Sequence, residues 1–201
     1  MYSTCALLVS AAALFAFGGA SPALAKVFHS QKEALALAFP DADRIESDTS
    51  VLSKQQVEWV EEASRSKLDT RIAKFYVAWK GGAVQGYAFI DVHTVRTLPE
   101  AFLVVLEPEG RVRSLRVLAF HEPLDYMPTR RWYEQFDGKT DADTMRLGHD
   151  VHGIVGATLS ARAVTSSVRR VLALYRFVVR GEKLVREEKA VKVELDGEEK
   201  N

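Results

Sequence analysis

The sequence predicts an α+β domain in which helices pack against an antiparallel sheet. Two pairs of strand-like segments, each joined by a short turn with Gly or Pro, stand at the centre of the pattern. Segments with apolar residues at helical spacing stand before and after these pairs. Hairpins flanked by helices are typical of a sheet covered by helices, not of alternating parallel strands and helices.

Two helices are expected before the first strand. Residues 31–39 are rich in Ala and Leu, and Pro40 closes this segment because it cannot continue a helix. Residues 53–65 form the second expected helix, with Ser53 as its candidate N-cap. The polar residues 41–50 between the two helices are expected to form a connector.

Four strands are expected next, as two hairpins. They are residues 72–79, 84–93, 101–106 and 112–120. Gly81 and Gly82 supply the first turn, and residues 107–110 supply the second.

Two further helices are expected after the hairpins. Residues 129–136 place Trp132 and Phe136 four apart, so both rings should share one face and enter the core. A longer amphipathic helix follows residue 160, with Ser160 as its expected N-cap. Its expected apolar face is Ala161, Val164, Val168, Val171, Leu172 and Tyr175, and its expected polar side is Arg162, Arg169, Arg170 and Arg176.

The N-terminal segment indicates export. Residues 1–25 contain no charged side chain and include an apolar run that is too short to span a membrane, which takes about 20 residues. Ala23-Leu24-Ala25 then forms a cleavage signal before Lys26. A periplasmic or otherwise exported protein is therefore expected, and an uncleaved anchor, which would make it membrane-associated, is the alternative.

Composition limits the chemistry of the remaining chain. Cys5 is the only cysteine, so residues 26–201 offer no thiolate for an iron–sulfur cluster, a haem attachment or a nucleophile. The 27 basic and 27 acidic residues balance, so nucleic acid is not an expected partner. The expected organisation is a signal peptide, an N-terminal helical and first-strand region, a main domain and a charged tail, over residues 1–25, 26–79, 80–180 and 181–201.

The stretch Gly156-Ala157-Thr158-Leu159-Ser160 is the strongest functional motif in the chain. A small-residue turn here places the hydroxyl of Thr158 just before a helix N-terminus, where unpaired backbone N–H groups favour a phosphate. A capped helix without a ligand is the simpler interpretation of this pattern.

Gly-Ala-Thr-x-Ser before an amphipathic helix resembles the motif of the FMN-binding domain family. This family includes the flavin-carrying C and G subunits of the sodium-pumping quinone reductase and of Rnf-type complexes. In these proteins a flavin transferase uses FAD to attach FMN to the Thr through a phosphoester bond. The resemblance implies that Thr158 carries a covalent FMN and covers about residues 80–180 of this chain. The implied cofactor-binding residues around it are Val155, Gly156, Ala157, Leu159 and Ser160.

Glu122 and Pro123 add a second point of resemblance, because the family has a Glu-Thr-Pro segment at the corresponding place. The resemblance implies that Glu122 lies near the flavin ring or its ribityl chain, whereas a plain surface turn at Pro123 is the alternative. Two positions depart from the family pattern. Val155 stands where the family usually has Ser or Thr, and His152 stands where it usually has Asp.

Three histidines stand near these motifs or at the end of an expected strand. His149 and His152 form an H-x-x-H pair, but no third ligand stands at a telling distance and no metal site is expected. His93 and Arg96 follow an expected strand and would either contact a phosphate or a partner, or lie in a solvated loop.

Two functions are compatible with these observations. The first is an exported flavoprotein electron carrier, matured by a flavin transferase and served by redox partner proteins that could belong to a membrane-bound electron-transport complex. No catalytic residue is then required, and the chain would be a redox subunit more than a stand-alone enzyme. The second is a non-catalytic binding or scaffold module of the same fold without covalent flavin.

Overall fold

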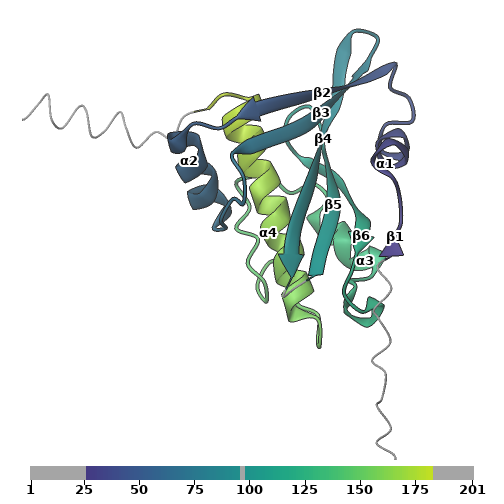
Figure 1. The fold of residues 1–201 in the computed structure, drawn as a ribbon, viewed down its shortest axis with the longest axis vertical. Helices are drawn as coiled ribbons and strands as arrows, with labels where there is room; N and C mark the ends of the chain where they lie inside the picture. The colour runs from purple at the N-terminus through teal and green to yellow at the C-terminus, as the bar shows by residue number, and fades with distance from the viewer. Residues whose placement is uncertain (1–25, 96–97, 183–201) are drawn as a thin grey trace, which may run out of the picture.

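The computed structural model describes residues 26–95 and 98–182 (Figure 1). These residues build one antiparallel sheet of six strands in the order β1-β6-β5-β4-β3-β2, with helices packed against it. The predicted α+β class is confirmed. The expected signal segment, most of the charged tail and Arg96 lie outside the described residues.

Both expected hairpins are present. The first is β3 (Ile72–Lys80) and β4 (Ala83–Val95), and the second is β5 (Leu98–Leu106) and β6 (Val112–Phe120). They also pair with each other, because β4 and β5 are antiparallel from Tyr87↔Leu106 to Val95↔Leu98. β5 is therefore a central strand of the sheet.

The expected connector at residues 41–50 is wrong. This segment forms β2 (Arg44–Val51), which pairs with β3 over its whole length at the edge of the sheet. Most of its side chains are exposed, so the strand lacks the apolar alternation by which a half-buried strand is recognised. The short β1 (Lys26–Val27), which no pattern indicated, pairs with β6 at the other edge.

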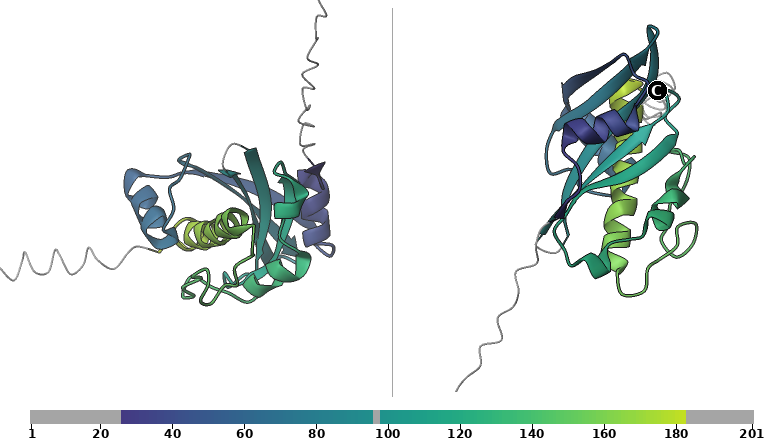
Figure 2. Two further views of the ribbon diagram at one scale, coloured as in Figure 1. Left: turned by 90° about the horizontal axis from the view of Figure 1, so that it is seen from below. Right: turned by 90° about the vertical axis from the view of Figure 1, so that its right-hand side faces the viewer.

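The two N-terminal helices form where they were expected. α1 (Gln31–Ala38) and α2 (Lys54–Ser64) each begin with a capping box, made by Ser30 and Ser53. α1 covers one face of the sheet through a core cluster that includes Leu35 and Leu103, whereas α2 packs against α4 (Figure 2).

The expected helix at residues 129–136 is shorter. α3 (Arg130–Tyr133) continues as a 3-10 turn, Glu134–Phe136. The Trp132 and Phe136 rings lie 5.4 Å apart, as their spacing predicted, and pack in the main core.

α4 (Thr158–Leu174) covers the second face of the sheet and ends in a π-helical turn, Tyr175–Val179 (Figure 2). Its expected apolar face is entirely buried. Arg170 is an exception to the expected polar side, because its side chain is only 11% exposed and lies against β4. Among the described residues no helix is long and apolar enough to cross a bilayer.

Candidate functional site

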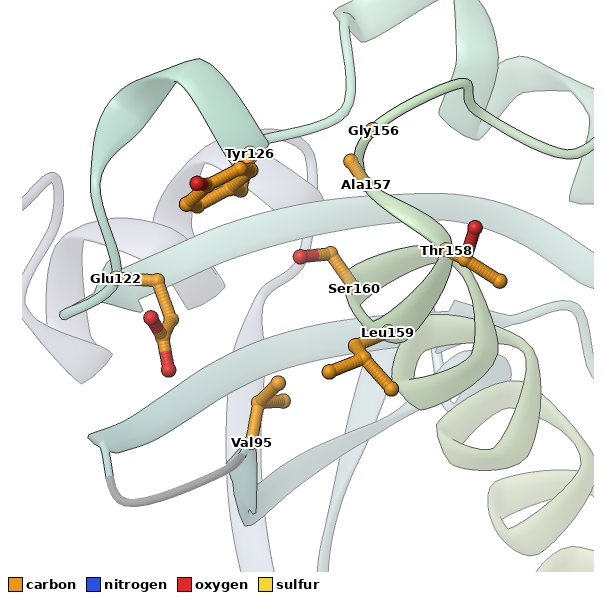
Figure 3. Close-up of a pocket in the computed structure, with 8 residues that line it drawn as sticks. All are labelled: Val95, Glu122, Tyr126, Gly156, Ala157, Thr158, Leu159 and Ser160. Carbon is orange, nitrogen blue, oxygen red and sulfur yellow. The ribbon is translucent and has the colours of Figure 1, made fainter.

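A pocket of about 220 Å³ lies at the N-terminal end of α4 (Figure 3). Three segments that are far apart in the sequence line it. They are Val95 at the end of β4, Glu122 and Tyr126 after β6, and the run from Gly156 to Ser160. The fold thus brings the two motif segments of the sequence to one place.

The expected N-cap at Ser160 is wrong, and so is the placement of Thr158 outside the helix. α4 begins at Thr158, its N-cap is Ala157, and no side chain caps it. Gly156 adopts a φ of +82°, which turns the chain so that the carbonyl of Ala157 accepts the first helical hydrogen bond from Ala161. The helix therefore starts three residues before the position that the sequence indicated, because its N-cap is Ala157 and not Ser160.

The hydroxyls of Thr158 and Ser160 have different surroundings. Ser160 is only 3% exposed, and Figure 3 shows its hydroxyl directed into the space between Tyr126 and Glu122. Thr158 is exposed, and its side chain projects from the other side of the helix. Of these two hydroxyls, only that of Thr158 is exposed and free to react with another molecule.

The start of α4 has the features of an anion site. In an α-helix the first backbone N–H groups have no intrahelical acceptor, and the dipole places partial positive charge there. Ser30 and Ser53 supply such acceptors for α1 and α2, but no side chain does so for α4. The N–H groups of Thr158, Leu159 and Ser160 fit a phosphate held beside them.

Glu122 supplies an acceptor inside the same pocket. Its Oε1 is buried and has no hydrogen-bond partner among the described residues, and Figure 3 shows its side chain directed toward Val95. A buried acceptor without a donor is costly, so it fits a ligand that brings an N–H or O–H group. Pro123 starts the 3-10 turn Leu124–Tyr126, because its carbonyl accepts from the Tyr126 N–H at 2.9 Å.

The remaining motif residues form the rim of the pocket. Leu159 lines it and is partly exposed, whereas Val155 is fully exposed and does not line it. His152 does not line it either. Its backbone is held by Trp132 and Gln135, through hydrogen bonds of 2.8 and 2.7 Å.

Asp150 orders the loop that leads to the motif. Its carboxylate accepts hydrogen bonds from the Thr144 hydroxyl, at 2.9 Å, and from the Arg146 N–H. His149 in the same loop is exposed. In the part of the chain that the structure describes, no three His, Cys, Asp or Glu side chains are grouped so that they could hold a metal ion.

A buried polar cluster beside the pocket was missed by the sequence interpretation. Arg170 of α4 donates two hydrogen bonds of 2.8 Å to the carboxylate of Asp91 on β4. The Asp91 Oδ2 also lies 3.0 Å from His93 Nδ1, and His93 Nε2 lies 3.8 Å from Oε2 of Glu100 on β5. His93 thus lies within a strand and is nearly buried, so the alternative of a solvated loop is wrong for this residue.

Electrostatics in this cluster favour its charged forms. Burial raises the pKa of Asp91, but the hydrogen bonds from Arg170 and His93 lower it more, so the net pKa lies well below the usual value. Burial lowers the pKa of His93, but its contacts with Asp91 and Glu100 raise it more, and the net pKa lies above the usual value. The spacing of Asp91 and His93 could have indicated this cluster, because residues two apart in a strand lie on the same face, here the inner one.

Comparison with known proteins agrees with the motif. Residues 99–173 match the family described as FMN-binding domain, and the match runs from β5 through Glu122 and Thr158 to the end of α4. No curated protein matches the chain. A domain of this family indicates a flavin-binding protein with FMN as its cofactor. The chain thus contains, over residues 99–173, an FMN-binding domain.

Proposed function

We propose that this protein is an exported electron carrier whose FMN is bonded through its phosphate to Thr158. The observation that carries the proposal is the exposed hydroxyl of Thr158 at the uncapped start of α4, on the edge of a pocket within an FMN-binding domain. A flavin transferase would form the bond, and redox partner proteins, in a membrane-bound complex or free, would exchange electrons with the flavin.

Thr158 is favoured over its neighbours by accessibility. A transferase must bring FAD to the hydroxyl, and Ser160 and Thr165 are both buried. The Thr165 hydroxyl also donates to the carbonyl of Ala161 at 2.7 Å. In the attachment step, Thr158 Oγ1 bonds to the phosphorus of the FMN half of FAD. The bond between the two phosphates breaks, AMP leaves and the hydroxyl proton is released.

The pocket residues have separate tasks in this proposal. The N–H groups at the start of α4 bind the phosphodiester anion. Glu122 Oε1 accepts a hydrogen bond from the flavin ring or from the ribityl chain, and Val95 and Leu159 supply apolar contact. Bound FMN would supply electron transfer, while the protein holds it and controls its access to water.

A covalent bond suits the size of the pocket. Sites that enclose a small organic ligand usually have volumes of about 300–1,000 Å³, and this pocket, at about 220 Å³, is smaller. Only part of the flavin is then enclosed. A weakly held cofactor is retained only while its free concentration exceeds its Kd, which an exported protein cannot rely on. The signal-like segment at residues 1–25 supports export.

Three variants test the attachment site. The chain is produced with a flavin transferase and run on a denaturing gel, where covalent flavin gives a fluorescent band. We expect the band in the natural chain and in Ser160→Ala, none in Thr158→Ala, and a retained but weaker band in Thr158→Ser. A band in Thr158→Ala would show that the flavin is attached to another residue. No band in any chain, with an active transferase present, would favour the scaffold module instead.

A further inference from the structure

The buried pair His93 and Glu100 has no place in the attachment of a flavin. Glu100 is 0% exposed, and neither of its carboxylate oxygens has a hydrogen-bond partner in the described structure. His93 Nε2, which faces it at 3.8 Å, is likewise buried and without a partner. Unsatisfied groups of this kind are rare in protein interiors and require an explanation.

We propose that this pair is a proton-binding site coupled to the redox state of the flavin, and that His93 Nε2 takes up a proton when the flavin gains an electron. The inference rests on the proposed function, because it needs a flavin in the neighbouring pocket.

The register of the sheet places the pair next to the pocket. His93 is the cross-strand partner of Glu100, and Glu100 is the partner of Phe120. Two pocket residues lie close by in the sequence. Val95 stands two residues after His93 on β4, and Glu122 stands two residues after Phe120, just beyond the end of β6. Two residues of a strand span about 7 Å, so the pair lies about one row of side chains from the pocket.

The hydrogen bonds define where the proton goes. The Asp91 carboxylate is held by Arg170 and accepts from Nδ1 of His93, so Nδ1 carries a hydrogen in either charge state. Nε2 of a neutral His93 is then an acceptor that faces the carboxyl group of Glu100 at 3.8 Å. Protonation turns Nε2 into a donor and gives Glu100 its missing partner through a charge-assisted contact.

Charge makes this protonation depend on the flavin. The Asp91 carboxylate and the Arg170 guanidinium compensate each other, so a proton on His93 Nε2 adds one positive charge to the cluster. An electron that arrives on the flavin from a donor protein adds negative charge nearby and favours the protonated form. The flavin is reduced, the donor protein is oxidised, the proton comes from solvent, and no bond of the chain breaks.

Solvent reaches the cluster from its other end. Asp91 and Arg170 line a second pocket of about 260 Å³, together with Lys67 and Asp69. Nδ1 of His93 already carries the hydrogen that it donates to Asp91, so the added proton goes to Nε2, beside Glu100.

The groups that face the pair come from several elements of the fold. β4 contributes Asp91, α4 contributes Arg170, and β5 contributes Phe102, whose ring stacks on His93 at 5.4 Å. α3 contributes Tyr133, whose hydroxyl is buried and whose pKa is raised by burial and by Glu100. Burial and Arg170 lower the pKa of His93, but its contacts with Asp91 and Glu100 raise it more, so these surroundings favour its protonated form.

Two measurements test the proposal. The first is the midpoint potential of the flavin-loaded protein against pH, for the natural chain and for His93→Gln, Glu100→Gln and Glu46→Gln. Glu46 is an exposed carboxylate on the edge strand and serves as the matched control. In the pH range where His93 titrates, the potential of the natural chain and of Glu46→Gln should fall more steeply with pH than that of the other two. The slopes of potential against pH can differ by at most about 59 mV per pH unit. This is the shift for one proton taken up per electron when the proton concentration changes tenfold.

The second measurement follows the His93 ring by NMR in Thr158→Ala, which carries no covalent flavin. Its pKa should lie above about 6.5 and should fall when Glu100→Gln is added. Equal pH slopes in all four loaded proteins, or a His93 pKa at or below 6.5, would overturn the proton site while leaving the flavin attachment intact. If the chain takes up no flavin, the proposed function and the coupling both fail. The NMR titration needs no flavin, so it still tests whether the His93 and Glu100 pair binds a proton.

Discussion

Replacing Arg170 with Met should weaken the fold more than any other single charge removal in the described core. The Arg170 and Asp91 side chains are 11% and 10% exposed, and two hydrogen bonds of 2.8 Å join them. Removing one partner of a buried pair leaves the other charge uncompensated, at a cost of about 3–5 kcal/mol. Asp91 keeps His93 as a partner, so we expect a loss near the lower limit, about 3 kcal/mol.

Urea unfolding at pH 7 measures this loss, and its pH dependence tests the cause. The pKa of Asp91 is lowered in the folded protein, so its stabilisation is present above about pH 4 and is lost as the pH falls through the folded value. The difference between the natural chain and Arg170→Met should therefore shrink below pH 4. Adding Asp91→Leu should recover most of the loss at pH 7. A loss below about 1 kcal/mol, or two additive single effects, would refute the role given to this pair.

Three further changes test other parts of the structure. Ser160→Ala should change the free energy of unfolding by less than about 0.5 kcal/mol, because Ser160 does not cap α4; a loss of 1 kcal/mol or more in urea unfolding would restore the cap. Gly110→Ala should cost about 2–3 kcal/mol, since its φ is +84° and a Cβ there would lie 2.1 Å from the Tyr175 ring. Gly138→Ala, at a φ of +79° but in open space, should cost only about 1 kcal/mol. Equal melting temperatures for the two variants would contradict this difference. The raised pKa of His93 gives a stabilisation that is fully present below about pH 6.5 and is lost as the pH rises through the folded value, so His93→Gln should flatten stability curves in that range.

The sheet was largely predictable because its central strands have strong local signals. β3, β4, β5 and β6 alternate or run apolar between clear turns, and Gly81 and Gly82 both adopt the positive φ that their turn requires. β2 gave no such signal, because an edge strand with most side chains in solvent has the composition of a loop. Its pairing with β3 is a tertiary property that no local window contains.

The site was predictable as a motif but not as a geometry. The start of α4 lies three residues earlier than the hydroxyl pattern indicated, because Gly156 and Ala157 form the turn and Ser160 points inward. Arg170 had the spacing of a solvated residue, and its partner Asp91 stands 79 residues away. Such a pair depends on how a helix and a strand meet, so the buried cluster could be found only in the folded chain.

The mass of the peptide that carries the motif tests the central claim most directly. The full chain is produced with a flavin transferase and digested with trypsin, which releases residues 147–162. In this peptide Thr158 and Ser160 are the only hydroxyl residues. The account predicts that the peptide gains the mass of one FMN less one water, and that fragmentation places the gain on Thr158. An unmodified peptide in the presence of an active transferase, or a gain placed on Ser160, would contradict it.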